Sequence, residues 1–266
     1  MVGDAVSWGE AQSADDGVFE RPFRLARPGS VVPGVVWLPS RSESSCPVVL
    51  LGHGGSGHKQ SDRMVALGRW FASHAGIVAV AIDGPYHGER VVSALTAADY
   101  QQRIMQEGLD VVVERMVCDW RAAVEAVSTL ERVDATNLGY FGLSMGTRFG
   151  LSFGAAAGAE LRCVILGKFG LQTAAGFYEN VDTTSRVKRD AGQLSAATLF
   201  HVQWDDELFP RAGQLALFDS LGAQEKILLA FPGGHGETHP AAPRLWCDFM
   251  LRHLRPDLAP LNHGSR

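Results

Sequence analysis

The sequence predicts an α/β fold, in which a mainly parallel central sheet carries helices on both faces. Short apolar runs alternate along the chain with longer segments in which apolar residues recur every three or four positions. The chain has 266 residues, of which 46% are hydrophobic, and this is enough for one sizeable core. We therefore expect a single domain over residues 17–254, with loose tails at residues 1–16 and 255–266.

The strands are expected in chain order from the apolar runs. Residues 18–25 and 31–38 predict two antiparallel strands at a sheet edge, where Pro33 is tolerated. Six further short runs, each bounded by turn residues, predict the remaining strands: residues 48–52, 77–82, 138–142, 161–166, 198–202 and 226–231.

The helices are expected between these strands. Met64, Leu67 and Phe71 predict one helix, with Ser61 as its N-cap. Between residues 97 and 130 the three- and four-residue spacing predicts one long amphipathic helix. Residues 167–195 lie between two strands and are too few for a cap domain, so we expect a small lid or none.

Composition and charge restrict the class of partner. The net charge is -5 and the pI is near 6.0, so no broad cationic field would attract nucleic acid or an anionic membrane. No apolar run approaches the ~18 residues that span a bilayer. The four cysteines are far apart and lack the CxxC spacing. We expect a cytoplasmic protein with reduced thiols and a small-molecule ligand; the oligomeric state is left open.

The strongest chemical signal is Gly142-Leu143-Ser144-Met145-Gly146, which follows an apolar strand and precedes a helical segment. In that setting a serine lies on a sharp, strained strand-to-helix turn with its hydroxyl exposed. The helix N-terminus places the Met145 N–H beside any negative charge that develops on a substrate oxygen. Ser144 is therefore the candidate nucleophile. Glycines at positions 146, 150, 154 and 158 predict close packing of this helix.

A candidate general base follows the last predicted strand. His235 lies in Pro232-Gly233-Gly234-His235-Gly236, where a loop histidine can reach back over the sheet to Ser144. His239 is its main competitor. The acidic segment around Asp205, Asp206 and Glu207 precedes a helix near Pro210. For Asp205 and Glu207 we expect a solvated turn that caps this helix.

These motifs resemble the α/β-hydrolases, and in particular the dienelactone-hydrolase-like esterases, from about residue 48 to the helix after Pro240. The resemblance implies a nucleophile, acid and histidine in the chain order Ser144, Asp206 and His235. Members that act on dienelactones use a cysteine nucleophile, so Ser144 argues against that substrate.

The resemblance also assigns the oxyanion hole and suggests a pocket. It implies that Gly55, in His53-Gly54-Gly55-Ser56-Gly57, donates its N–H together with Met145. His53 is expected to brace this loop. Residues 83–90 resemble a family loop that forms one pocket wall, and Arg90 there either receives a substrate carboxylate or forms a surface ion pair. The candidate pocket residues are Tyr86, His87, Phe169, Phe177 and Tyr178.

The combined interpretation is a serine esterase that cleaves small carboxylic esters through an acyl-enzyme. No cofactor is needed, and the histidines lack the spacing of a metal site. Three alternatives remain open: an acyltransferase or a lactonase on the same three residues, or a non-catalytic ligand-binding protein with this fold.

Overall fold

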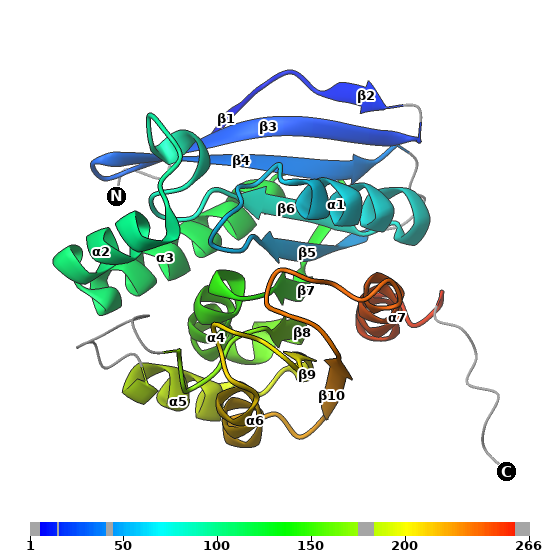
Figure 1. Cartoon of the computed structure of the whole chain (residues 1–266). Helices are drawn as coiled ribbons and strands as arrows, with labels where there is room; N and C mark the ends of the chain where they lie inside the picture. The colour runs from blue at the N-terminus through cyan, green and yellow to red at the C-terminus, as the bar shows by residue number, and fades with distance from the viewer. Residues whose placement is uncertain (1–5, 15, 41–44, 175–183, 259–266) are drawn as a thin grey trace, which may run out of the picture.

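A computed structural model describes residues 6–14, 16–40, 45–174 and 184–258 (Figure 1). Its strands are β1 (Val6–Trp8), β2 (Gln12–Ala14), β3 (Val18–Arg27), β4 (Ser30–Pro39), β5 (Cys46–Gly52), β6 (Val78–Ile82), β7 (Val133–Gly142), β8 (Leu161–Gly167), β9 (Ala197–Gln203) and β10 (Lys226–Phe231). They form one sheet in the order β1-β3-β4-β6-β5-β7-β8-β9-β10, with β2 beside β3. The six strands from β6 to β10 in this order are parallel, and β3 and β4 are antiparallel.

Helices cover both faces of this sheet, as Figure 1 shows. The α-helices are α1 (Asp62–Ala75), α2 (Ala97–Glu107), α3 (Leu109–Ser128), α4 (Met145–Ala157), α5 (Thr184–Gln193), α6 (Arg211–Ser220) and α7 (Ala242–Leu254). One core contains buried side chains of α1 and α7, and the other contains those of α2 to α6. The predicted fold class is thus confirmed. In the described part of the chain, no helix is long and apolar enough to cross a membrane.

The prediction of one long helix over residues 97–130 is wrong, because Gly108 divides it. Gly108 has φ 101°, which a residue with a side chain rarely adopts, and its N–H closes α2 on the carbonyl of Ile104. Thr96 and Asp99 form a capping box at the start of α2. The chain therefore builds two helices here, and α2 carries its own buried residues toward the loops described below.

The prediction of loose tails also needs correction. β1 and β2 lie within residues 1–16, and both pair with β3, so these segments belong to the sheet. At the other end, the Arg255 guanidinium donates to the carbonyl of Ala75 at the end of α1, with 3.0 Å between the two atoms. Residues 255–258 are thus attached to the fold.

The candidate functional residues lie at the carboxyl ends of the parallel strands. All six strands run the same way, so the loops that follow them meet at one edge of the sheet. These loops carry His53, Asp83, Ser144, Asp206 and His235. A site built here draws on segments that are almost two hundred residues apart in the sequence.

Candidate active site

Ser144 occupies a strained turn between β7 and α4. Its backbone angles are φ 57° and ψ -119°, a region that strongly favours glycine. The turn is tight enough that a Cβ at Gly146 would lie 2.5 Å from the Gly52 carbonyl oxygen, so only glycine fits there. Thr147 stands where a second glycine is often found. Its hydroxyl accepts from the Gly167 N–H and lies within hydrogen-bond distance of the Gly142 and Gly167 carbonyl oxygens, to one of which it can donate. These contacts hold the turn from behind.

A continuous chain of hydrogen bonds joins the three residues proposed for catalysis. The Ser144 Oγ lies 2.9 Å from the His235 Nε2, and the His235 Nδ1 lies 2.9 Å from the Asp206 Oδ2. The Asp206 carboxylate is fully buried, whereas 16% of the His235 side chain is exposed. His239 instead stacks on Phe231, with 4.3 Å between ring centroids. The structure therefore brings His235, and not His239, to Ser144.

The acidic turn after β9 is exposed, as the sequence predicted, but its exposed carboxylates do not cap α6. Glu207 accepts a hydrogen bond from the His235 backbone N–H at 2.8 Å, and this bond lowers the pKa of its carboxyl group. Asp205 accepts from the Gly233 N–H at 3.2 Å. Both side chains are exposed, as expected, but the expected helix-capping role is wrong, because both carboxylates instead hold the histidine loop against the loop of Asp206.

The glycine loop after β5 is supported by two histidines. The His53 Nδ1 donates to the Gly54 carbonyl, and its Nε2 accepts from the Gly84 N–H. Burial, followed by the nearby His87, lowers the pKa of His53 to about 4, so it is a neutral brace between two loops. The His87 Nε2 lies 2.9 Å from the Gly55 carbonyl oxygen. His87 therefore supports the loop that contains Gly55.

A buried ion pair ties the same loop to the one after β6. Lys59 and Asp83 are almost fully buried, and 2.9 Å separates the Lys59 Nζ from the Asp83 Oδ2. Arg90 is also buried and pairs with Asp119 at 2.6 Å. An ion pair for Arg90 is therefore confirmed, but the expectation that it lies at the surface is wrong, because the Arg90 and Asp119 side chains are only 7% and 1% exposed. These contacts fix both loops relative to the sheet.

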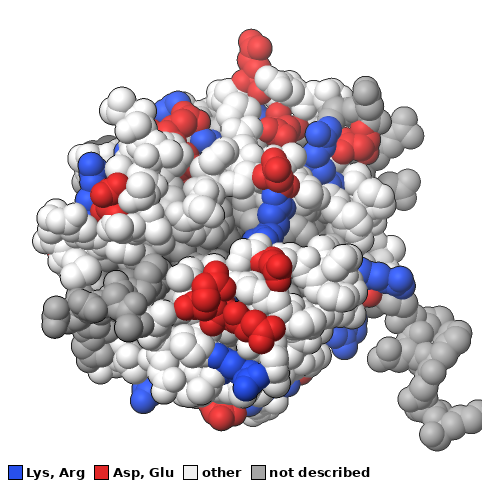
Figure 2. Space-filling model, viewed as in Figure 1, with Lys and Arg blue, Asp and Glu red and all other residues white. Residues whose placement is uncertain are grey.

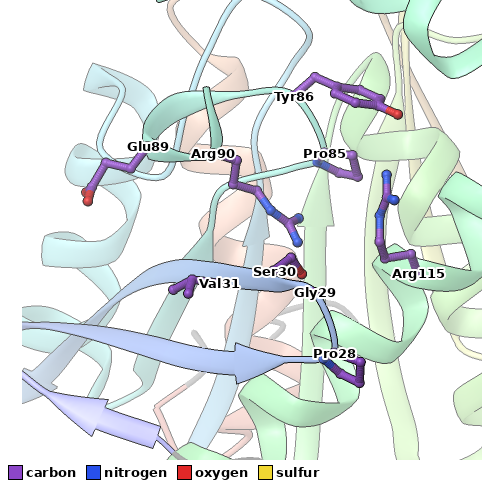
Figure 3. A pocket seen from close by; sticks show the side chains of 9 residues that line it. All are labelled: Pro28, Gly29, Ser30, Val31, Pro85, Tyr86, Glu89, Arg90 and Arg115. Atoms are coloured by element: carbon purple, nitrogen blue, oxygen red, sulfur yellow. The ribbon is translucent and has the colours of Figure 1, made fainter. Parts of the chain in front are cut away.

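The suggested pocket residues have different surroundings. The Tyr86 hydroxyl bonds to Glu107, and its ring faces Arg115, so it contacts α2 and α3 rather than Ser144. Tyr86 lines a separate cavity of about 420 Å³, beside the β3–β4 turn (Figure 3). Phe169 is buried against Phe209, whose ring in turn lies 5.7 Å from that of His235. Phe177 and Tyr178 lie outside the described residues.

The charge around the site is mainly acidic. Figure 2 shows acidic side chains grouped on this face over the loops after β9 and β10, with basic side chains next to them. Asp205, Glu207 and Glu237 belong to those loops. Within the described ranges, no three His, Cys, Asp or Glu side chains are placed to hold a metal ion.

Sequence reasoning overlooked two residues at this site. Lys168 follows β8 directly and is buried beneath the histidine loop, where its ammonium bonds the His235 carbonyl. Its position directly after a parallel strand that neighbours β7 could have indicated that Lys168 lies near the site. Tyr100, on α2, packs so closely on Gly55 that a Cβ there would collide with its hydroxyl. The capping residues Thr96 and Asp99 could have located the start of its helix.

Comparison with solved structures gives close matches over most of the chain. A cold-adapted esterase from an Arctic intertidal metagenomic library is 32% identical, with a TM-score of 0.79; the match covers 94% of this chain and all of that one. An acetyl xylan esterase from Thermoanaerobacterium sp. is 18% identical (TM-score 0.73; coverage 94% and 88%). A dienelactone hydrolase from Anabaena variabilis is 17% identical (TM-score 0.65; coverage 90% and 100%).

No model of a protein family matches the chain, and no curated protein sequence matches it. The two matches below 20% identity show that the fold is shared with acetyl xylan esterases and dienelactone hydrolases. The match at 32% extends over the full length of an esterase. This chain therefore belongs to the α/β-hydrolase esterases, and it is a carboxylic ester hydrolase.

Proposed function

We propose that the protein cleaves small carboxylic esters through an acyl-enzyme formed on Ser144, with His235 as general base and Asp206 as the acid behind it. The hydrogen-bonded chain from the Ser144 Oγ through the His235 imidazole to the buried Asp206 carboxylate carries this proposal. Each member has the surroundings that its role requires.

The first half of the reaction forms the acyl-enzyme. The Ser144 Oγ attacks the ester carbonyl while its proton passes to the His235 Nε2. Asp206 accepts from the Nδ1–H, which keeps Nε2 free as the acceptor and stabilises the imidazolium. The N–H groups of Met145 and Gly55 are the proposed donors to the oxyanion, since the first N–H groups of α4 lack partners within the helix. The imidazolium then protonates the alcohol as it leaves.

The second half uses water. Water attacks the acyl carbonyl while His235 accepts its proton, and the same two N–H groups stabilise the second tetrahedral intermediate. The imidazolium then protonates the Ser144 Oγ as its bond to the acyl carbon breaks, and the carboxylic acid is released. Asp206, His235 and Ser144 return to their starting protonation states. Every step is carried by side chains and backbone groups of this chain.

Short acyl chains are the proposed substrates. Phe209 packs beside His235, and Phe169 packs on Phe209. Among the described residues, α5 is the one helix between β8 and β9, so we infer a small lid at most. A short lid gives little apolar surface to enclose a long acyl chain. Rates on p-nitrophenyl esters from acetate to laurate should fall with chain length, and a jump in rate on long-chain emulsions would contradict this proposal.

The central test is Ser144→Ala. We expect loss of ester turnover by roughly a millionfold and loss of covalent labelling by a fluorophosphonate, with an unchanged circular dichroism spectrum. Product analysis with added alcohol separates hydrolysis from acyl transfer. Ester turnover or labelling that survives in the folded variant would remove Ser144 from the mechanism.

A further inference from the structure

A buried lysine lies beneath the histidine loop and has no place in the reaction as described. Lys168 is 2% exposed and follows the last residue of β8. Its φ of 47° is in the left-handed region, where residues with side chains are uncommon. Its backbone N–H donates to the His201 carbonyl at 2.8 Å, so the main chain there is anchored to β9. The backbone conformation and the burial of Lys168 together direct its side chain toward the loop that carries His235.

The ammonium of Lys168 contacts three residues of that loop. Its Nζ lies 3.1 Å from the His235 carbonyl oxygen and 3.3 Å from the Thr238 Oγ1, and it also contacts the Glu237 carbonyl. These three acceptors are uncharged, and they match the three N–H donors of an ammonium in number. One of them belongs to the peptide unit of His235 itself. Movement of this amine would therefore move the imidazole.

Charged and titratable groups on several neighbouring elements surround the Lys168 ammonium. Arg63 of α1 also bonds the Thr238 hydroxyl, at 3.0 Å. Burial and the Arg63 charge lower the pKa of Lys168 to about 8, against the opposing effect of Asp206, Glu237 and Glu207. His201, whose own pKa is lowered to about 4 by burial, is neutral at any pH where this lysine titrates. The lysine thus loses its charge at mildly alkaline pH.

We propose that Lys168 is a positioning residue for His235. The Lys168 ammonium fixes residues 235–238, so that the His235 imidazole lies within hydrogen-bond distance of Ser144. The inference rests on the proposed function of His235. A neutral amine has only two N–H donors and no charge, so it can still donate to the two carbonyls, but it no longer donates to Thr238 and its remaining hydrogen bonds lose their charge assistance. The loop is then held less firmly, and turnover falls as pH rises through about 8.

The test compares Lys168→Met and Lys168→Arg with the wild type on one short-chain p-nitrophenyl ester between pH 6 and 10. Methionine keeps much of the volume without the donors, and we expect kcat at pH 7.5 to fall by ~10²-fold with a much smaller change in KM. The remaining activity should not decline near pH 8. Arginine keeps its charge, so it should restore part of kcat and move the decline to higher pH.

Lys226→Met is the matched control. The Lys226 Nζ also donates to three backbone carbonyls, those of Phe218, Asp219 and Leu221 at the end of α6, away from Ser144. This variant should keep wild-type kcat and the decline near pH 8. Thermal unfolding of all variants shows whether each is folded at the assay temperature.

Two outcomes would overturn the proposal. One is a Lys168→Met variant with wild-type kcat and an unchanged alkaline decline. The other is a loss of kcat that leaves the decline where it was and that arginine does not restore, because a lysine with only a packing role would behave in this way. Failure of the proposed function has a different signature, namely ester turnover that persists in Ser144→Ala.

Discussion

The two oxygens of the Asp206 carboxylate have separate partners. Oδ1 accepts from the N–H groups of Leu208 and Phe209, at 2.9 and 2.8 Å, and so holds the turn that leads into α6. Oδ2 accepts from His235. The turn thereby fixes the carboxylate before any substrate arrives, and the imidazole is oriented by a group that cannot rotate away.

Asp206→Asn should reduce kcat by roughly 10⁴-fold with the fold retained, the size found for the corresponding change in a serine protease. The amide oxygen can keep the two turn hydrogen bonds, but its NH₂ group would then face the His235 Nδ1. The imidazole must change tautomer to accept this bond, and its Nε2–H can no longer take the Ser144 proton. Steady-state kinetics on an activated ester measures the loss.

Asp205→Asn is the companion variant. Asp205 accepts one hydrogen bond, from Gly233, and an amide oxygen can replace that acceptor. We expect its kcat to stay within a few-fold of the wild type. If the effects of the two variants were exchanged, the acid would be Asp205.

At the scale of elements, α2 presses against the glycine loop that carries the proposed oxyanion donor. The nearest atom to a Cβ added at Gly55 is the Tyr100 hydroxyl, with which it would collide. A Cβ at the neighbouring Gly54 would meet nothing closer than the Leu143 carbonyl oxygen, at 3.8 Å. There is therefore space for a Cβ at Gly54, whereas α2 leaves none at Gly55.

Gly55→Ala should lower kcat by about 10²-fold, the usual cost of losing one oxyanion donor, because the methyl group displaces either the loop or Tyr100. Gly54→Ala is the matched control and should remain near wild type. Tyr100→Phe, added to Gly55→Ala, removes the colliding oxygen and should recover part of the loss. Strictly additive effects of the two changes on kcat would show that Tyr100 and Gly55 do not interact.

The elements that the sequence predicted well are strands with a continuous apolar run, which residues 161–166 and 226–231 illustrate. Their apolar runs coincide with β8 and β10 within one residue. Gly108 was missed because apolar residues continue at helical spacing on both sides of it. β1 and β2 were missed because each has three residues, too few for an alternating pattern, and they form by pairing with β3.

The candidate site was predictable where a local motif carries the residue. Ser144 and His235 lie in glycine-rich turns directly after strands, and the structure places them 2.9 Å apart. Lys168 and Tyr100 were not predicted, because no local sequence motif indicates that either residue contacts the site. Their relation to the site depends on which strands become neighbours and on where α2 packs.

At the scale of the whole molecule, two buried neutral histidines make stability depend on pH. Burial lowers the pKa of both His53 and His201 from 6.5 to about 4. The unfolded chain binds these protons at higher pH than the folded protein does. Their contribution is therefore fully present above pH ~6.5 and is lost as pH falls toward 4, at a cost of roughly 3 kcal/mol for each.

Urea unfolding between pH 7 and 4.5 tests this expectation. The free energy of unfolding should fall with acidification, and His201→Gln should fall less steeply than the wild type because one of the two groups is gone. His74→Gln removes an exposed histidine and should leave the slope unchanged. Parallel curves for the wild type and His201→Gln would mean that His201 is not held neutral by the fold.

The site draws its groups from the loops after β5, β7, β9 and β10, with Lys168 added from the end of β8. These strands are the centre and one side of the sheet, and neighbours such as β5 and β7 are joined only by long stretches of intervening chain. No short segment of the chain contains all the groups on which the proposed nucleophile Ser144 depends. The proposed reactivity of Ser144 would consequently be a property of the assembled domain. Labelling by a fluorophosphonate could then serve as a reporter of complete refolding, where far-UV circular dichroism registers only secondary structure.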